Sequence, residues 1–206
     1  PSSSHTAGAV RLGLLARNIY KNTPTKVLFR LYNSYAHTGK GHGTEKGLLA
    51  GVLGLPVDDR RIRNIFESEL AKSIDYKFEY YDNFKLHPNA VDIIFSGEHK
   101  MSISGESVGA GEIAIRKIND FNVKLTGRYN TVLLVYKDMP GMISQVTSLL
   151  QYHNINIASL NCDRSAKGKE ASMIISIDGH IDTTVVETIE EIPDVYFVSY
   201  IEKLEN

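Results

Sequence analysis

The stretch TVLLVYKDMPGMISQVTSLLQYHNINIASLNCDR, residues 131–164, decides the fold of the second half of the chain. It opens with β-branched and other apolar side chains up to Tyr136, which predict a strand. A turn follows at residues 138–141. Apolar side chains then recur at helical spacing, at Met142, Val146, Leu149 and Leu150. A second strand is predicted over residues 155–163, so the stretch indicates a strand–helix–strand unit.

The rest of this half completes a known order of elements. Periodicity predicts a strand, a helix and a final strand at residues 171–177, 182–191 and 195–201. The order strand–helix–strand–strand–helix–strand is that of the ferredoxin-like, split βαβ motif. A short polar joint, Thr126-Gly127-Arg128, precedes it. We therefore expect two domains, at residues 1–127 and 128–206.

The first half mixes helices and strands, so the predicted fold class of the chain is α+β. Helical spacing of apolar residues predicts helices over residues 6–20, 45–53 and 58–72. Runs rich in β-forming residues predict strands at 26–32, 76–81, 91–96, 100–104, 112–118 and 121–125. Residues 36–44 are rich in glycine and histidine, and they predict a loop between the first strand and the second helix.

Composition narrows the classes of function. The formal net charge of −1 argues against a nucleic-acid partner, because binding phosphates needs an excess of Lys and Arg. No apolar run approaches the roughly 18 residues of a membrane-spanning helix, and no signal peptide opens the chain. We therefore expect a cytoplasmic protein with no membrane partner. The chain opens at Pro1 rather than Met, so we expect a short segment ahead of it.

Cys162 is the one cysteine of the chain. A single thiol excludes a disulfide framework and any metal centre held by several thiolates of this chain alone. We expect no metal site in this chain.

The first candidate site is a cluster of hydroxyls and one imidazole ahead of the first predicted helix. It comprises Ser2, Ser3, Ser4, His5 and Thr6. A helix start presents free backbone N–H groups and partial positive charge, so it binds a carboxylate or phosphate. The alternative is ordinary: one serine caps the helix and the others face solvent.

The second candidate site is Gly39-Lys40-Gly41-His42-Gly43-Thr44. Glycines let the backbone approach a ligand closely, and an imidazole between two of them can act as a base near neutral pH. The spacing fits neither the Walker phosphate loop nor the dinucleotide fingerprint. A flexible loop with an exposed histidine is the alternative.

These motifs resemble those of the beta chain of iron–sulfur L-serine dehydratases. Residues 1–8, PSSSHTAG, are similar to the signature near the start of that family, and residues 41–46, GHGTEK, are similar to its second signature. Residues 107–113, SVGAGEI, resemble a glycine-rich turn of the family, although Ala110 stands where glycine is common. The resemblance extends over essentially the whole chain.

The resemblance implies an enzyme subunit that converts L-serine to pyruvate and ammonia without pyridoxal phosphate. It implies a 4Fe-4S cluster whose cysteines belong to a separate alpha chain, and a first domain of the allosteric-substrate-binding type whose motifs line the active site. The reaction needs a base to take the α-proton of serine, and we expect His42 in this role, with His5 second, unless the alpha chain supplies the base. Expected substrate-binding residues are Ser2, Ser3, Ser4, Thr6, Gly43 and Thr44.

The second domain resembles the ACT domain, in which the turn after the first strand commonly borders an amino-acid site. Gly141 offers backbone access, and the helix start behind it favours a carboxylate. The expected ligand site comprises Asp138, Pro140, Gly141, Met142, Asn156 and Ile157. Many ACT units bind nothing and only dimerise, and this alternative stays open. We expect a homodimer through this domain, or a heterotetramer with alpha chains.

Two other functions stay open at this point. The chain is alternatively a stand-alone amino-acid sensor, with Ser2 to Thr6 as ordinary helix capping. A hydrolase using Ser4 with His5 or His42 is the weaker alternative, because the sequence has no nucleophile elbow and no convincing acidic partner.

Overall fold

The computed structural model describes residues 4–39 and 43–205. By its internal contacts the chain divides into two compact units, and the boundary in the sequence falls between Asp120 and Phe121. Among the described residues, none of the helices is long and apolar enough to cross a membrane.

The first unit carries a mixed sheet, with strand order β2-β1-β3-β4-β5-β6. Its strands are β1 (Lys26–Tyr32), β2 (Asp75–Tyr81), β3 (Ala90–Ser96), β4 (Met101–Gly109) and β5 (Glu112–Ile118). The last strand in this order, β6 (Phe121–Leu125), falls in the second unit. Its helices are α1 (Ser4–Tyr20), α2 (Ser34–Gly39), α3 (Gly43–Val52), the 3-10 helix η1 (Arg60–Glu67) and α4 (Glu69–Lys72). Strand β1 pairs parallel with β2 and antiparallel with β3.

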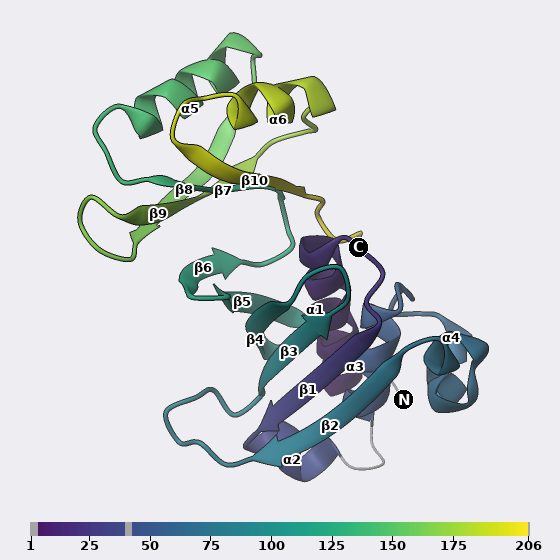
Figure 1. Ribbon diagram of the computed structural model, residues 1–206. Helices are drawn as coiled ribbons and strands as arrows, with labels where there is room; N and C mark the ends of the chain where they lie inside the picture. The colour runs from purple at the N-terminus through teal and green to yellow at the C-terminus, as the bar shows by residue number, and fades with distance from the viewer. Residues whose placement is uncertain (1–3, 40–42, 206) are drawn as a thin grey trace. The chain divides into compact units, whose positions relative to one another are not determined.

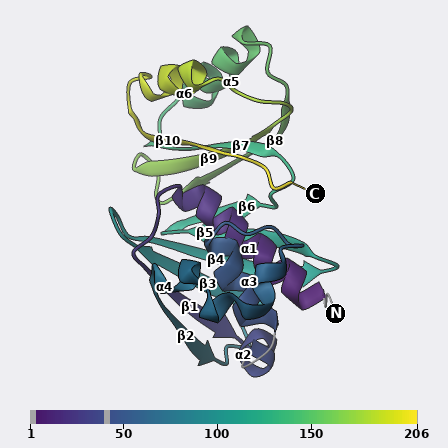
Figure 2. The same cartoon turned by 90° about the vertical axis from the view of Figure 1, so that its right-hand side faces the viewer.

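Alternating apolar residues give the sheet one buried face. In β1 these are Val27, Phe29 and Leu31, all fully buried. Figures 1 and 2 show α1 and α3 against the sheet, and α1 contacts β3, β4 and β5.

Helices α1 and α3 pack at close range because glycines line their contact. A Cβ on Gly51 would overlap the carbonyl oxygen of Val10, and one on Gly13 would lie 2.5 Å from the carbonyl oxygen of Leu48. Small residues let two helix backbones approach in this way. The crossing fixes the start of α3 beside the start of α1.

Two predictions for this unit were wrong. The glycine- and histidine-rich segment is not a loop throughout, because Ser34–Gly39 forms α2. Residues 58–72 are not one helix. Asn64 departs from helical angles inside η1, and the Ser68 side chain accepts a hydrogen bond from the Ala71 N–H, which starts α4 separately. Strand β4 also runs further than the predicted 100–104.

The second unit confirms the ferredoxin-like order. Its elements are β7 (Asn130–Lys137), α5 (Met142–Tyr152), β8 (Ile157–Arg164), β9 (Glu170–Ile177), α6 (Thr183–Glu190) and β10 (Val195–Ile201). The antiparallel sheet has the order β10-β7-β9-β8. Helices α5 and α6 pack on one face of it, with Val146, Leu150 and Ile189 among the buried residues.

The compact second unit begins earlier than the predicted joint at residue 127. The reason is β6, which contacts β8: the Asn122 N–H donates to the Asp163 carboxylate at 3.3 Å. A domain boundary after residue 127 stays a prediction.

Candidate functional site

The starts of α1 and α3 meet at Thr6 and Gly43. A Cβ on Gly43 would overlap the Thr6 hydroxyl, and one on Gly47 would lie 2.8 Å from the Thr6 carbonyl oxygen. Ser4 is the first residue of α1, and Gly43 is the first of α3. Ser2, Ser3 and His42 lie outside the described residues. The structure therefore brings the described parts of the two predicted motifs together.

The glycine-rich turn after β4 lies beside the same helix start. Ser107 is buried, and a Cβ on Gly8 would overlap its hydroxyl. A Cβ on Gly111 would lie 3.9 Å from the Cβ of Ala7. The three segments that carry the resemblance thus converge on the first turns of α1.

Tyr35, from α2, lies next to Gly8 of α1. Its side chain is fully buried, and its hydroxyl would lie 3.7 Å from a Cβ on Gly8. Burial raises the pKa of Tyr35 to about 12, and the nearby Ser107 hydroxyl acts in the opposite direction. His5 is exposed, and its ring centre lies 6.3 Å from that of Tyr35.

Two helix starts lie side by side in this region. The backbone N–H groups and aligned peptide dipoles at a helix start favour a carboxylate or phosphate. Glu45 already occupies the first turn of α3; it is buried, and its carboxylate accepts a hydrogen bond from the Tyr80 hydroxyl. Burial, and then the Glu45 carboxylate, raise the pKa of Tyr80. Thr44 is buried with 2% of its surface exposed.

Sequence reasoning missed Tyr35 and the Glu45–Tyr80 pair. Glu45 lies within residues 41–46, the segment that resembles the second family signature, and this is a weak signal. No pattern marks Tyr35 or Tyr80, because their roles depend on chain segments distant in sequence.

Metal-binding side chains do not gather in the described part of the chain. No group of three or more His, Cys, Asp or Glu residues is placed to hold an ion there. Cys162 is exposed on β8. His37 pairs instead with Asp82, Nε2 to Oδ1 at 2.7 Å.

In the second unit, Asp138 belongs to the end of the sheet near the β8–β9 hairpin. Its carboxylate accepts a hydrogen bond from the Gly168 N–H at 3.1 Å and lies 3.6 Å from Arg164 Nε. Pro140 and Gly141 are exposed beside it, and Gly141 has a φ of 91° at the start of α5. Met142 is buried in the core.

Asn156 and Ile157 lie at the other end of the sheet. Asn156 Nδ2 donates to the Asp178 carboxylate at 2.7 Å. Asn156 and Ile157 line a shallow pocket together with Thr147 and Gln151. Strand β8 separates this end from Arg164, and at about 3.3 Å per residue its ends are roughly 23 Å apart. One copy of the chain does not bring the six predicted ligand residues together.

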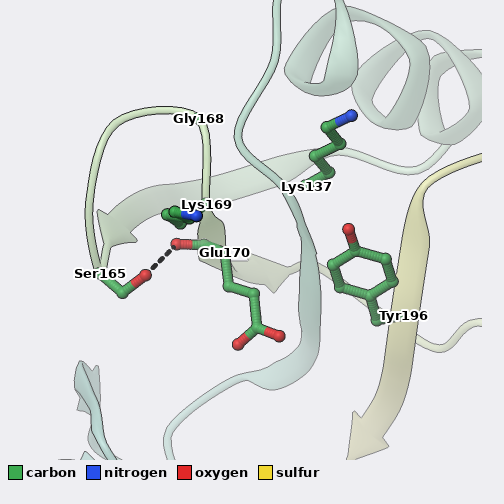
Figure 3. Close-up of a pocket in the computed structure, with 6 residues that line it drawn as sticks. All are labelled: Lys137, Ser165, Gly168, Lys169, Glu170 and Tyr196. Carbon is green, nitrogen blue, oxygen red and sulfur yellow. Dashed lines mark hydrogen bonds between the residues drawn. The ribbon is translucent and has the colours of Figure 1, made fainter.

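A second pocket lies beside Asp138, at the hairpin end of the sheet. Figure 3 shows Lys137, Lys169 and Tyr196 around it, and the Ser165 hydroxyl donates to the Glu170 carbonyl oxygen at 2.9 Å. These side chains come from the surface of β7, the β8–β9 hairpin and β10.

The fold and these sites define an α+β protein whose second unit is an ACT domain. The model of the AHAS small subunit-like ACT domain matches residues 132–197, and the model of the serine dehydratase beta chain matches residues 1–72. The chain belongs to the L-serine dehydratase beta chain family.

Relatives with that name match nearly the whole chain. The chain is 40% identical over 196 residues to the L-serine dehydratase, beta chain, of Peptoniphilus asaccharolyticus, which covers 92% of this chain and 85% of the relative. It is 35% identical over 202 residues to the Probable L-serine dehydratase, beta chain, of Bacillus subtilis, with coverage of 98% and 92%. It is 32% identical over 139 residues to L-serine dehydratase 2 of Escherichia coli, with coverage of 55% and 30%.

Proposed function

We propose that this chain is the beta subunit of an L-serine ammonia-lyase, which converts L-serine to pyruvate and ammonia only together with an alpha chain. The observation that carries the proposal is the meeting of Thr6 and Gly43 at two helix starts, in a chain similar to L-serine dehydratase beta chains along nearly its full length. A pair of helix starts suits the carboxylate of an amino-acid substrate.

The proposed cofactor is a 4Fe-4S cluster on the alpha chain. Such clusters are held by about three or four cysteine thiolates. This chain offers one thiol, Cys162, which is exposed on β8 of the second unit. Its residues do not fit the cluster, so the partner has to supply the ligands.

Within this chain, we assign substrate binding to Ser2, Ser3, Ser4, Thr6, Gly43 and Thr44. Their hydroxyls and backbone N–H groups supply donors to the serine carboxylate. His42 is the proposed base that takes the α-proton, with His5 second. The exposure of His5 beside the helix starts supports a role in contact with substrate.

For the ACT domain we propose amino-acid binding linked to a homodimer. Asp138 and Asn156 lie at opposite ends of one sheet, so a site containing both needs a second copy. Strand β8 is an edge strand, and antiparallel pairing with its copy would bring the two ends together. Light scattering that gives the mass of one chain at all concentrations, with and without L-serine, would contradict this part.

The test of the enzyme proposal is anaerobic reconstitution. The chain is mixed with a cysteine-bearing partner chain encoded beside it, and pyruvate formation from L-serine is measured for each chain alone and for the pair. We expect turnover only from the pair.

Three other results would favour the alternatives. Serine binding by this chain alone, with no turnover in any mixture, would indicate a stand-alone amino-acid sensor. Turnover by this chain alone would refute its dependence on a partner. Rapid labelling of Ser4 by a serine-directed organophosphate would indicate a hydrolase.

A further inference from the structure

Tyr35 places a hydroxyl where an apolar side chain would be more stable. The side chain is 0% exposed, and of the described residues none forms a hydrogen bond of normal geometry with its hydroxyl. Burying a hydroxyl without a hydrogen bond costs stability. Native proteins keep few such groups, so this one calls for an explanation beyond folding.

The position of the hydroxyl supplies an explanation. Ser107 continues the buried face of β4, and its hydroxyl and that of Tyr35 both lie under Gly8. Two residues before Gly8, Thr6 meets Gly43 at the start of α3. The two hydroxyls therefore lie against the helical turn that carries the first motif.

We infer that Tyr35 and Ser107 are positioning residues that fix the first turn of α1, and with it His5 and Thr6, relative to the start of α3. The inference deepens the proposed function and rests on it for its catalytic consequence. A shift of about 1 Å in such a turn can cost up to a hundredfold in rate.

The direct test is Tyr35→Phe in the reconstituted pair. Removing an unpaired buried hydroxyl should leave the thermal midpoint of this chain unchanged or raise it. Pyruvate formation should fall, with kcat/KM lower by the order of tenfold. A merely structural tyrosine would lose stability and activity together.

Tyr20→Phe is the matched control. Tyr20, the last residue of α1, is also buried, but its hydroxyl donates to the His99 carbonyl oxygen at 2.9 Å. This variant should lower the thermal midpoint and keep the kcat/KM of the folded chain. If both variants behave alike in both measurements, the inference is wrong.

A second comparison tests whether the two hydroxyls act as one unit. Ser107→Ala should lower kcat/KM, and Tyr35→Phe/Ser107→Ala should lose no more than the worse single variant. Multiplied losses in the double variant would refute a shared role.

A third measurement needs no activity. Amide hydrogen exchange at Gly8 to Arg11 of the isolated chain should speed up in Tyr35→Phe and stay unchanged in Tyr20→Phe. If the wild-type pair forms no pyruvate, the proposed function fails while this measurement still decides the positioning. Unchanged exchange in Tyr35→Phe would refute it.

Discussion

Single contacts decide how the two motifs of the first unit meet. The Thr6 hydroxyl occupies the space that a side chain on Gly43 would need, and the Ser107 hydroxyl does the same opposite Gly8. Gly43 and Gly8 therefore lack a side chain because one particular neighbour occupies that space, not because the backbone needs to be flexible there. Two changes of single residues test these contacts.

Gly43→Ala should destabilise the chain by about 1–3 kcal/mol, because the added methyl group overlaps the Thr6 hydroxyl. Urea unfolding measures the loss. Thr6→Ala/Gly43→Ala is the control, since it removes the overlapping hydroxyl and should recover part of the stability. A double variant less stable than Gly43→Ala would mean that Thr6 is not the obstacle.

Tyr35 also predicts how stability depends on pH. Burial raises its pKa from the ordinary value of 10.0 to about 12. Below pH 10 both the folded and the unfolded chain keep the proton, so the contribution to stability is fully present. Between pH 10 and 12 the unfolded chain loses the proton more readily, so the free energy of unfolding falls. Denaturant titrations across this range should show a shallower fall for Tyr35→Phe than for the wild type; equal slopes would contradict the assignment.

At the scale of elements, the crossing of α1 and α3 holds the site together. Gly51 allows this crossing because its α-carbon faces the backbone of α1, where the Val10 carbonyl oxygen leaves no room for a methyl group. A flexible side chain can move aside, but a packed backbone cannot do so without shifting a helix.

Gly51→Ala should therefore cost at least about 2 kcal/mol and also reduce serine turnover by the reconstituted pair. Lys46→Ala, on the partly exposed side of the same helix, is the matched control and should change the free energy of unfolding by less than about 1 kcal/mol. Equal effects from the two variants in thermal unfolding would show that the crossing tolerates an added methyl group.

Runs of β-forming residues predicted β1, β5 and β6 at their observed bounds, and hydrophobic periodicity predicted the full order of the second unit. It failed where local hydrogen bonds outweigh burial. In the segment from 58 to 72, the Ser68 side chain caps a new helix, and in α2 the Thr38 hydroxyl donates to the Ser34 carbonyl oxygen. The parallel pairing of β1 with β2 could not be predicted, because neither strand's sequence indicates its partner.

At the scale of the whole molecule, the chain combines a unit with two adjoining helix starts and an ACT unit. The family resemblance implies that the first and second motifs line one site, and Thr6 and Gly43, described residues of the two motifs, lie against each other. The sequence did not predict that Asp138 and Asn156 lie at opposite ends of a sheet, because that distance depends on strand length and direction rather than on motif spacing. Tyr35 was missed for a similar reason: one tyrosine in a short helix forms no pattern.

The central claim is that the histidines of the two motifs act on serine, and turnover by variants of the reconstituted pair tests it most directly. His42→Ala should lower kcat by about 10²–10⁴-fold if His42 takes the α-proton, and His5→Ala should lower kcat/KM. His180→Ala, an exposed histidine of the second unit, should leave both constants unchanged. Wild-type turnover in His42→Ala and His5→Ala, or an equal loss in His180→Ala, would contradict the account.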